Sequence, residues 1–220
     1  MRIYKQSLEQ PVWMGQSARR LIEFLRLWET NKTNGDEEFW QIKFSEHPYV
    51  LPQVFSAPAV LIGEKAYVGG MKVDKADARF VDYLFAGETS KDALLVELKT
   101  PVTKLLGSKY RKVYKPSPDL TGAMVQVLDY RRQLTLDLES VTRTGEQRLD
   151  YFNPRCLLLI GNGEAELSDA KKRESFEIFR GGVRNVEILT FDELFRKIGA
   201  LATLFNLVYQ PAETAPTRSP

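Results

Sequence analysis

Apolar residues recur at helical spacing near the N-terminus. The positions Ala18, Leu21, Ile22, Leu25 and Trp28 share one face, which predicts an amphipathic helix over Ser17–Trp28. After the turn-forming stretch Asn31–Gly35, Asp36 is suited to cap a second helix, which we expect Pro48 to end. The buried side of this second helix is expected to comprise Phe39, Trp40 and Phe44, with Ile42 or the stem of Lys43.

From Ala59 to Lys99 the pattern changes to short β-branched and aromatic segments separated by glycines. This pattern is typical of an antiparallel meander. The expected strands are a first at either Val60–Ile62 or Tyr67–Val68, a second at Phe80–Phe85 and a third at Ala93–Lys99. The connection Ala86–Asp92 has the length and the chemistry of a hairpin loop.

The second half of the chain alternates between helical and strand patterns. Ser117 can cap a helix that has Pro118 in its first turn. The apolar stripe of that helix leaves Gln126, Tyr130 and Gln133 together on an adjacent face. The pattern then predicts a buried strand, a helix, a strand and a closing helix, at Arg155–Gly161, Ala165–Phe179, Val186–Leu189 and Phe191–Leu207. This order predicts a mixed α/β fold with an antiparallel half and a parallel half.

Composition narrows the chemistry that the chain can perform. Its 220 residues include 31 Lys+Arg and 29 Asp+Glu, a net charge of +2, and the 43% hydrophobic content is sufficient for a compact core. The single cysteine, Cys156, excludes an intramolecular disulfide and a multi-cysteine metal site. A catalytic triad or a two-histidine metal site would depend on His47 alone, at a predicted helix end. Carboxylates and lysines are therefore the expected catalytic groups.

No segment has the apolar pattern of a signal peptide or of a membrane span, which needs about 20 apolar residues. The longest apolar run, Cys156–Ile160, is short enough to be a buried strand. We therefore expect a cytoplasmic protein with no membrane partner.

Charged residues interrupt two of the predicted apolar strands. Glu97 and Lys99 lie among leucine and valine, and the two-residue period of a strand places them on one face. Asp82 interrupts the preceding strand, and in a hairpin it lies across from this pair. A hard cation would offset the cost of burying these groups, with Asp82, Glu97 and the Leu98 backbone carbonyl as ligands for Mg²⁺. Lys99 would orient or help to deprotonate a water and offset charge on a phosphate.

The arrangement of Asp82 on one hairpin strand and Glu97-Leu98-Lys99 on the next resembles the motif of the PD-(D/E)xK nuclease superfamily. An isolated Glu-x-Lys pair is more often structural, but here it lies in an apolar strand and a helix with Gln126 follows. The resemblance implies a restriction-endonuclease-like α/β core of helix, antiparallel three-strand meander, helix and strand. This chain adds a C-terminal helix, strand and helix.

A more specific resemblance extends over residues 36–207. The chain is similar to the nuclease domain of the Shedu anti-phage defence proteins at Glu37–Gln41, Phe44, His47–Leu51, Asp82, Leu95–Pro101, Leu120–Gln126, Tyr130 and Ile188–Leu194. The resemblance implies that Asp82 and Glu97 bind Mg²⁺, or Mn²⁺ in its place, and that Lys99 is the catalytic lysine. It also implies that Gln126 lies in the active site and that Glu37 or Glu38 joins it.

The resemblance also suggests how the chain is organised. Residues 36–209 form the expected nuclease domain, residues 1–35 a short N-terminal helical extension, and residues 210–220 a disordered tail. Family members usually carry a longer N-terminal regulatory region. Related nucleases often form homo-oligomers, so a dimer or a tetramer is expected. The helix Ser17–Trp28 could lie at such an interface or pack within the subunit.

A basic segment directly follows the predicted metal-binding strand. From Lys99 to Pro118 there is no acidic residue. The basic positions after Lys99 are Lys104, Lys109, Arg111, Lys112 and Lys115, and Tyr110 and Tyr114 are interleaved with them. Such a segment is placed to bind a phosphate backbone, and Arg131 and Arg132 extend it. The alternative is a solvated, mobile loop. We expect DNA binding with weak sequence preference and strong dependence on salt.

Two functions remain open from the sequence. The first is a metal-dependent DNA endonuclease that acts in anti-phage defence. The second is a non-catalytic DNA-binding or assembly subunit on the same fold, in which the acidic residues are structural. The presence of Asp82, Glu97 and Lys99 together favours the first.

Overall fold

A computed structural model of the chain describes residues 11–69, 79–136 and 150–204. The chain divides into two compact units, one of which is Thr33–Leu194, while the other combines the segments before Thr33 and after Leu194. The expected disordered tail, residues 210–220, lies outside the described residues, as does the expected end of the last helix at Leu207.

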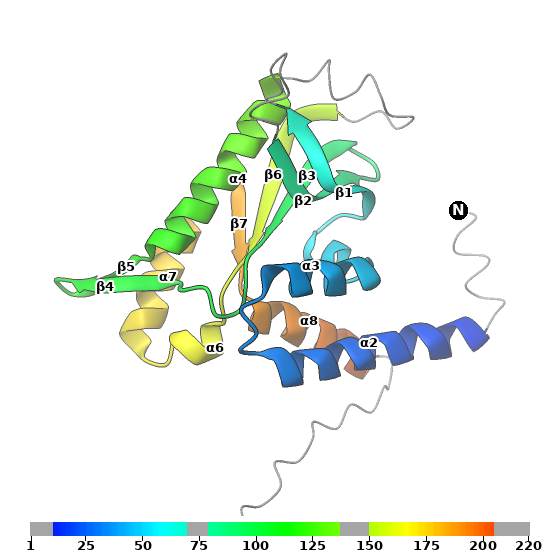
Figure 1. The fold of residues 1–220 in the computed structure, drawn as a ribbon, viewed down its shortest axis with the longest axis horizontal. Helices are drawn as coiled ribbons and strands as arrows, with labels where there is room; N and C mark the ends of the chain where they lie inside the picture. The colour runs from blue at the N-terminus through cyan, green and yellow to red at the C-terminus, as the bar shows by residue number, and fades with distance from the viewer. Residues whose placement is uncertain (1–10, 70–78, 137–149, 205–220) are drawn as a thin grey trace, which may run out of the picture. The chain divides into compact units, whose positions relative to one another are not determined.

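The unit Thr33–Leu194 contains a five-stranded mixed sheet among its described residues (Figure 1). Its strands, in the order in which they pair, are β1 Ala59–Gly69, β2 Arg79–Gly87, β3 Asp92–Leu98, β6 Asp150–Leu159 and β7 Val186–Leu189. The pairs β1–β2 and β2–β3 are antiparallel, whereas β3–β6 and β6–β7 are parallel. The predicted meander and the mixed α/β class are confirmed.

β1 is one strand that contains both of the segments between which the sequence left a choice. Its register against β2 shifts between Leu61 and Gly63, and again between Tyr67 and Gly69. Lys65 lies between these shifts and has a φ of 44°. Such irregularities interrupt the alternation of apolar and polar positions, so the sequence suggested two alternative, shorter positions for this strand.

The long helix α4 Pro118–Leu136 packs against the sheet. Ser117 caps it as predicted, because the Ser117 Oγ accepts the Leu120 amide at 2.9 Å. The buried residues of α4 join those of the sheet in one hydrophobic cluster, which includes Leu120, Ala123, Val127, Leu134, Leu84, Leu95 and Leu158. Asp82 and Glu97 lie two residues along from Leu84 and Leu95, on the same face of their strands.

The helix α3 Glu37–Glu46 begins at the predicted cap, since the Asp36 side chain accepts the Phe39 amide at 3.2 Å. Trp40 and Phe44 are fully buried, as predicted, but Ile42 is 49% exposed and does not belong to the buried side. A 3₁₀ helix, η1 Leu51–Val54, follows.

The basic segment forms a structure that the sequence did not predict. The strands β4 Leu106–Tyr110 and β5 Val113–Pro116 pair as an antiparallel hairpin that is separate from the main sheet (Figure 1). We refer to β4, β5 and their connecting turn as the basic hairpin. The segment is therefore a hairpin, and its basic side chains Lys109, Arg111, Lys112 and Lys115 are exposed to solvent.

The helix expected at Ala165–Phe179 is two helices, α6 Gly163–Glu166 and α7 Ala170–Gly182. The break occurs because the Asp169 side chain accepts the Lys172 amide at 2.9 Å and starts a new helix. Leu167 remains buried at the break, so the apolar spacing continued across it and concealed the change.

The other unit contains α2 Pro11–Asn31 and the part of α8 Phe191–Leu204 that follows Leu194. The ring of Phe195 stacks on Phe24 and on Trp28, with centroid distances of 4.9 and 4.7 Å. The predicted N-terminal helix is therefore present and longer than expected. No helix among residues 11–69, 79–136 and 150–204 is long and apolar enough to cross a membrane.

Candidate active site

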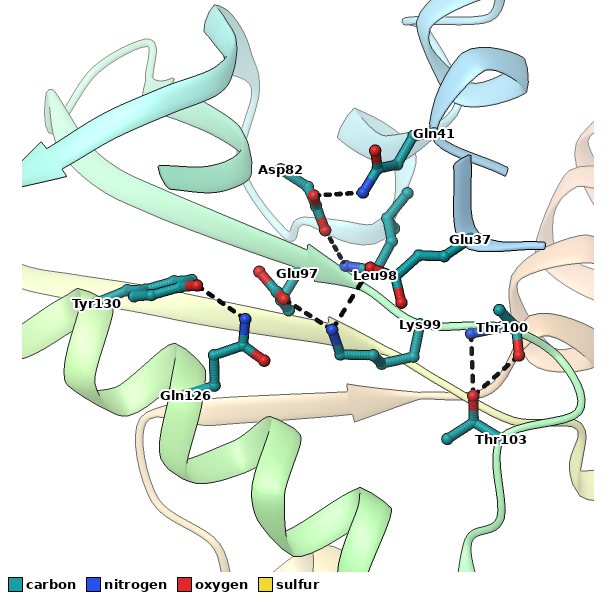
Figure 2. Close-up of polar contacts among 10 residues, drawn as sticks. All are labelled: Glu37, Gln41, Asp82, Glu97, Leu98, Lys99, Thr100, Thr103, Gln126 and Tyr130. Carbon is teal, nitrogen blue, oxygen red and sulfur yellow. Dashed lines mark hydrogen bonds and ion pairs between the residues drawn. The ribbon is translucent and has the colours of Figure 1, made fainter. Parts of the chain in front are cut away.

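Asp82 and Glu97 face each other where strands β2 and β3 cease to pair. The last paired residues are Tyr83 and Val96, one position before the two carboxylates. Instead of a backbone carbonyl on β2, the Asp82 Oδ2 accepts the Leu98 amide at 2.7 Å (Figure 2). On its other side β3 stays in the sheet, because the Lys99 amide donates to the Leu159 carbonyl at 2.8 Å.

Lys99 completes a charged cluster with Asp82 and Glu97. Its Nζ lies 3.0 Å from the Glu97 Oε1, and Glu97 is only 3% exposed. Lys99 itself is half-buried. We use the term charged cluster for Asp82, Glu97 and Lys99. Two carboxylates and one ammonium thus share a site with little access to water, as the sequence predicted.

Helix α3 contributes two more side chains to this site. The Gln41 Nε2 donates to the Asp82 Oδ1 at 2.7 Å, and the Glu37 Oε1 lies 3.6 Å from the Lys99 Nζ (Figure 2). The sequence left the choice between Glu37 and Glu38 open; Glu37 lies at the site, and Glu38 is exposed. Gln41 was missed, although its spacing of four residues from Glu37 places both on one helix face.

The charged cluster shifts the pKa values of all three of its groups. Burial, together with the charge of Glu37, raises the pKa of Asp82 to about 6. Burial and the neighbouring Asp82 carboxylate raise the pKa of Glu97 to about 7. Burial alone would lower the pKa of Lys99, but the charges of Glu97, Glu37 and Asp82 outweigh it and raise that pKa. Lys99 therefore holds its proton at neutral pH.

The donor set of the cluster fits a hard divalent cation. Two carboxyl groups share one ammonium and burial raises the pKa of both, so a second positive charge would favour their ionised forms. In the part of the chain that the structure describes, no group of three or more Asp, Glu, His or Cys side chains could hold a metal ion. A cation would thus take only two side-chain ligands here, and Mg²⁺ commonly binds in this way and keeps several waters.

Leu98 and Gln126 complete the set of predicted site residues. The Leu98 side chain is fully buried and its amide is bonded to Asp82, so its backbone carbonyl is the group that it can offer a cation. Gln126 lies on α4, whose surface faces Glu97 and Lys99 (Figure 2). Its Nε2 donates to the Tyr130 hydroxyl at 2.8 Å. This bond fixes the Gln126 amide on the face that the helical spacing predicted.

Comparison with known sequences supports the resemblance to the Shedu proteins over most of the chain. Residues 34–195 match the family described as "Shedu protein SduA, C-terminal". The chain belongs to the Shedu family. The Shedu protein SduA of Bacillus cereus (strain B4264) is 40% identical over 194 residues, which are 84% of this chain and 51% of that protein. The chain thus spans about half the length of this Shedu relative.

The basic residues of this Shedu chain lie apart from the charged cluster. Lys104 precedes the basic hairpin, Lys109 and Lys115 lie on its strands, and Arg111 and Lys112 form its turn; all five are exposed. Arg131 has a different position. It lies on α4 and its Nε donates to the Pro154 carbonyl at 2.6 Å, which ties the helix to β6.

The single histidine and the single cysteine lie outside the charged cluster. The His47 Nδ1 is 2.8 Å from the Tyr49 hydroxyl at the end of α3. Cys156 is buried in the sheet, and burial raises the pKa of its thiol to about 12. Cys156 is therefore a core residue, as predicted, and not a reactive thiolate.

Proposed function

We propose that this Shedu chain is a metal-dependent DNA endonuclease that hydrolyses phosphodiester bonds and acts in anti-phage defence. The observation that carries the proposal is the charged cluster itself, with the buried Glu97 carboxylate, the half-buried Asp82 carboxylate and an ammonium at the point where β2 and β3 separate. A structural ion pair needs one carboxylate for one ammonium. The second carboxylate is an energetic cost that folding alone does not explain.

The order of elements supports a PD-(D/E)xK nuclease fold. Helix α3 precedes the antiparallel strands β1, β2 and β3, and α4 then leads to β6, which is parallel to β3. This is the helix, three-strand meander, helix and strand that the resemblance implies. The proposed nuclease domain, residues 36–209, includes the charged cluster, Gln126 and the basic hairpin.

The proposed cofactor is Mg²⁺, for which Mn²⁺ can substitute. Asp82 and Glu97 would hold the ion together with the Leu98 carbonyl. When bound, such an ion supplies positive charge to the phosphate oxygens and lowers the pKa of a water nucleophile. Gln41 and the Leu98 amide orient the Asp82 carboxylate, since each donates to a different oxygen of it.

Lys99 is suited to supply positive charge and a hydrogen bond, and not to accept a proton as a base. Its ammonium is held between Glu97 and Glu37, and its raised pKa keeps it protonated at neutral pH. It can therefore donate a hydrogen bond to the attacking water or to a phosphate oxygen, and so stabilise the charge that develops in the transition state. Gln126 would orient the substrate or the water from the side of α4.

The test is cleavage of circular and linear DNA in the presence of Mg²⁺ or Mn²⁺. Glu97→Gln keeps the size of the side chain and removes its charge, so we expect cleavage to be lost while the circular dichroism spectrum is unchanged. Glu187→Gln, at an exposed position on β7, is the matched control and should cleave like the wild type. Equal cleavage by Glu97→Gln and the wild type would contradict a catalytic role of the charged cluster, and no cleavage by the wild type would favour the non-catalytic subunit. For the role in defence, the same variant should no longer reduce phage plaque numbers.

We also propose that the protein forms a homodimer or homotetramer, so that more than one active site engages a duplex. Light scattering tests this directly, because the chain has a mass of 25.2 kDa. A measured mass equal to that of one chain at micromolar concentration would contradict the assembly. It would leave the nuclease proposal unaffected.

A further inference from the structure

The basic hairpin carries exposed positive charge that no acidic side chain balances. The segment that contains the hairpin, from Lys99 to Pro118, has no Asp or Glu. Lys109, Arg111, Lys112 and Lys115 are all exposed. Within the described residues none of these four forms an ion pair, whereas exposed lysines elsewhere, such as Lys171 with Glu174 at 2.7 Å, do so. A one-sign surface of this kind attracts a polyanion.

The two faces of the hairpin differ in their surroundings. Tyr114 on β5 is half-buried against the hydrophobic core, and its amide donates to the Ser175 Oγ on α7 at 3.0 Å. Tyr110 and Val113 are paired across the ladder and are 54% and 44% exposed. Because neighbours along a strand point to opposite sides, Tyr110, Val113 and Lys115 form a face directed away from α7.

Arg111 and Lys112 form the end of the hairpin. Arg111 adopts a φ of 54°, and its guanidinium lies over the Tyr110 ring at 5.5 Å from the centroid. This cation–π contact limits the conformations of the arginine before any ligand binds. A guanidinium held in this way is suited to the planar, bidentate contacts that phosphates and guanine edges offer.

The base of the hairpin is fixed by polar contacts and close packing. The Glu166 carboxylate on α6 accepts the amides of Leu105 and Leu106, both at 2.8 Å. The Ser117 amide donates to the Leu105 carbonyl at 3.0 Å. Gly161 lies so close that a Cβ there would be 2.6 Å from the Leu105 Cδ2. The hairpin is therefore anchored to the α6 segment and to the end of β6.

We propose that the basic hairpin is a rigid arm that enters the major groove of duplex DNA and holds the duplex against the charged cluster. This inference rests on the proposed nuclease function and identifies the element that recognises its substrate. The major groove, about 12 Å wide, accepts a two-stranded ribbon and presents the methyl group of thymine, which the minor groove, about 6 Å wide, does not present. Arg111 and Lys112 contact phosphates or base edges, and Tyr110 and Val113 supply apolar contacts to thymine methyl groups.

The test compares the double variant Arg111→Ala/Lys112→Ala with a matched control, Arg184→Ala/Lys197→Ala. The control removes the same charge from exposed positions outside the hairpin. Fluorescence anisotropy measures the binding of a labelled duplex in buffer with EDTA, so that cleavage cannot interfere. We expect the hairpin variant to bind at least tenfold more weakly, with a salt slope reduced by about 2, since each lost phosphate contact lowers the slope by about 0.9.

Groove-specific competitors test the position of the arm. Methyl green, a major-groove ligand, should reduce wild-type affinity to that of the hairpin variant, whereas the minor-groove ligand netropsin should leave the difference between them intact. Equal affinity and equal salt slope for the hairpin variant and the wild type would overturn the proposal. So would stronger hairpin-dependent binding to a single strand than to the duplex.

Hydrolysis of bis(p-nitrophenyl) phosphate with Mn²⁺ separates this inference from the nuclease proposal. This small diester does not need the arm, so the hairpin variant should hydrolyse it at the wild-type rate. If the wild type binds duplex through the hairpin but cleaves neither DNA nor the ester, the nuclease proposal fails and the arm stands. If the wild type cleaves DNA and the hairpin variant binds and cleaves equally well, the arm is wrong and the nuclease stands.

Discussion

The charged cluster and the basic hairpin are close neighbours in the sequence, but they place charge in opposite environments. In the cluster, Glu97 is almost completely buried and Lys99 is bonded to it at 3.0 Å. In the hairpin, Lys109, Lys112 and Lys115 are exposed and, among the described residues, have no ion-pair partner. The first arrangement alters pKa values and fixes geometry, whereas the second produces a field that water and salt weaken with distance.

This contrast separates two tasks that a nuclease must perform. Binding a long polyanion requires many weak, reversible contacts at exposed positions. Accelerating hydrolysis requires a few groups whose positions are fixed before the substrate arrives. Under the proposed function the two tasks fall on different elements, so substitutions should affect binding and catalysis separately.

The largest expected effect is that of Lys99→Ala in the charged cluster, and Lys115→Ala on the basic hairpin is the substitution with which it is compared. Lys99→Ala removes the ammonium of the cluster and should lower kcat for DNA cleavage by about 10²–10³, the range for loss of one transition-state donor, with little change in Kd. Lys115→Ala removes an exposed ammonium from the hairpin and should weaken binding a few-fold with kcat unchanged. Single-turnover cleavage and anisotropy measure the two quantities. Similar changes in both parameters for both variants would break the comparison.

A smaller effect is expected at Gln41, which contacts Asp82 but lies outside the charged cluster. Gln41→Ala removes the donor to the Asp82 Oδ1. Loss of such an orienting contact typically lowers metal affinity or activity by about 10- to 100-fold. The concentration of Mg²⁺ for half-maximal cleavage should rise, whereas DNA affinity in EDTA should not change. Gln53→Ala, at an exposed position, is the control, and an unchanged Mg²⁺ requirement for Gln41→Ala would argue against its orienting role.

The smallest expected effect is a pH dependence of stability without metal. The folded-state pKa of Glu97, about 7, lies above its ordinary value of 4.5, so the folded state binds more protons between these limits. The contribution is therefore fully present below about pH 4.5 and is lost as the pH rises through 7. Urea denaturation in EDTA should show the free energy of unfolding from this group falling over that interval. Glu97→Gln should flatten the dependence, and Glu187→Gln should retain it.

The sequence predicted the charged cluster because its residues violate the pattern around them. Carboxylates and an ammonium inside apolar strands have a high cost, and a regular two-residue period determines which of them share a face. Asp82, Glu97 and Lys99 were therefore identifiable with no knowledge of tertiary structure. Gln126 and Tyr130 were placed on one helix face because they are four residues apart and lie beside a regular apolar stripe.

The remaining features depend on contacts between distant segments or on local caps. The helical spacing places Gln41 on the same face as Glu37, but only the approach of α3 to β2 brings its side chain to Asp82. The basic hairpin is stabilised by Glu166 and Ser175, about sixty residues later in the chain. The break before α7 depends on a single capping side chain, Asp169, within an apolar pattern that continues unchanged.

The attachment of the hairpin to β3 has a mechanical consequence. The Thr103 amide donates to the Thr100 carbonyl, which also accepts the Gly161 amide at 2.9 Å, so the chain that leaves Lys99 is fastened to the end of β6. A force applied to the hairpin is therefore shared by β3 and β6. Because the two strands are parallel and paired from Leu94 to Leu98, a force that both strands share does not shift one of them along the other. A force on the hairpin would therefore leave the register of β3 against β6, and with it the position of Glu97 on β3, unchanged.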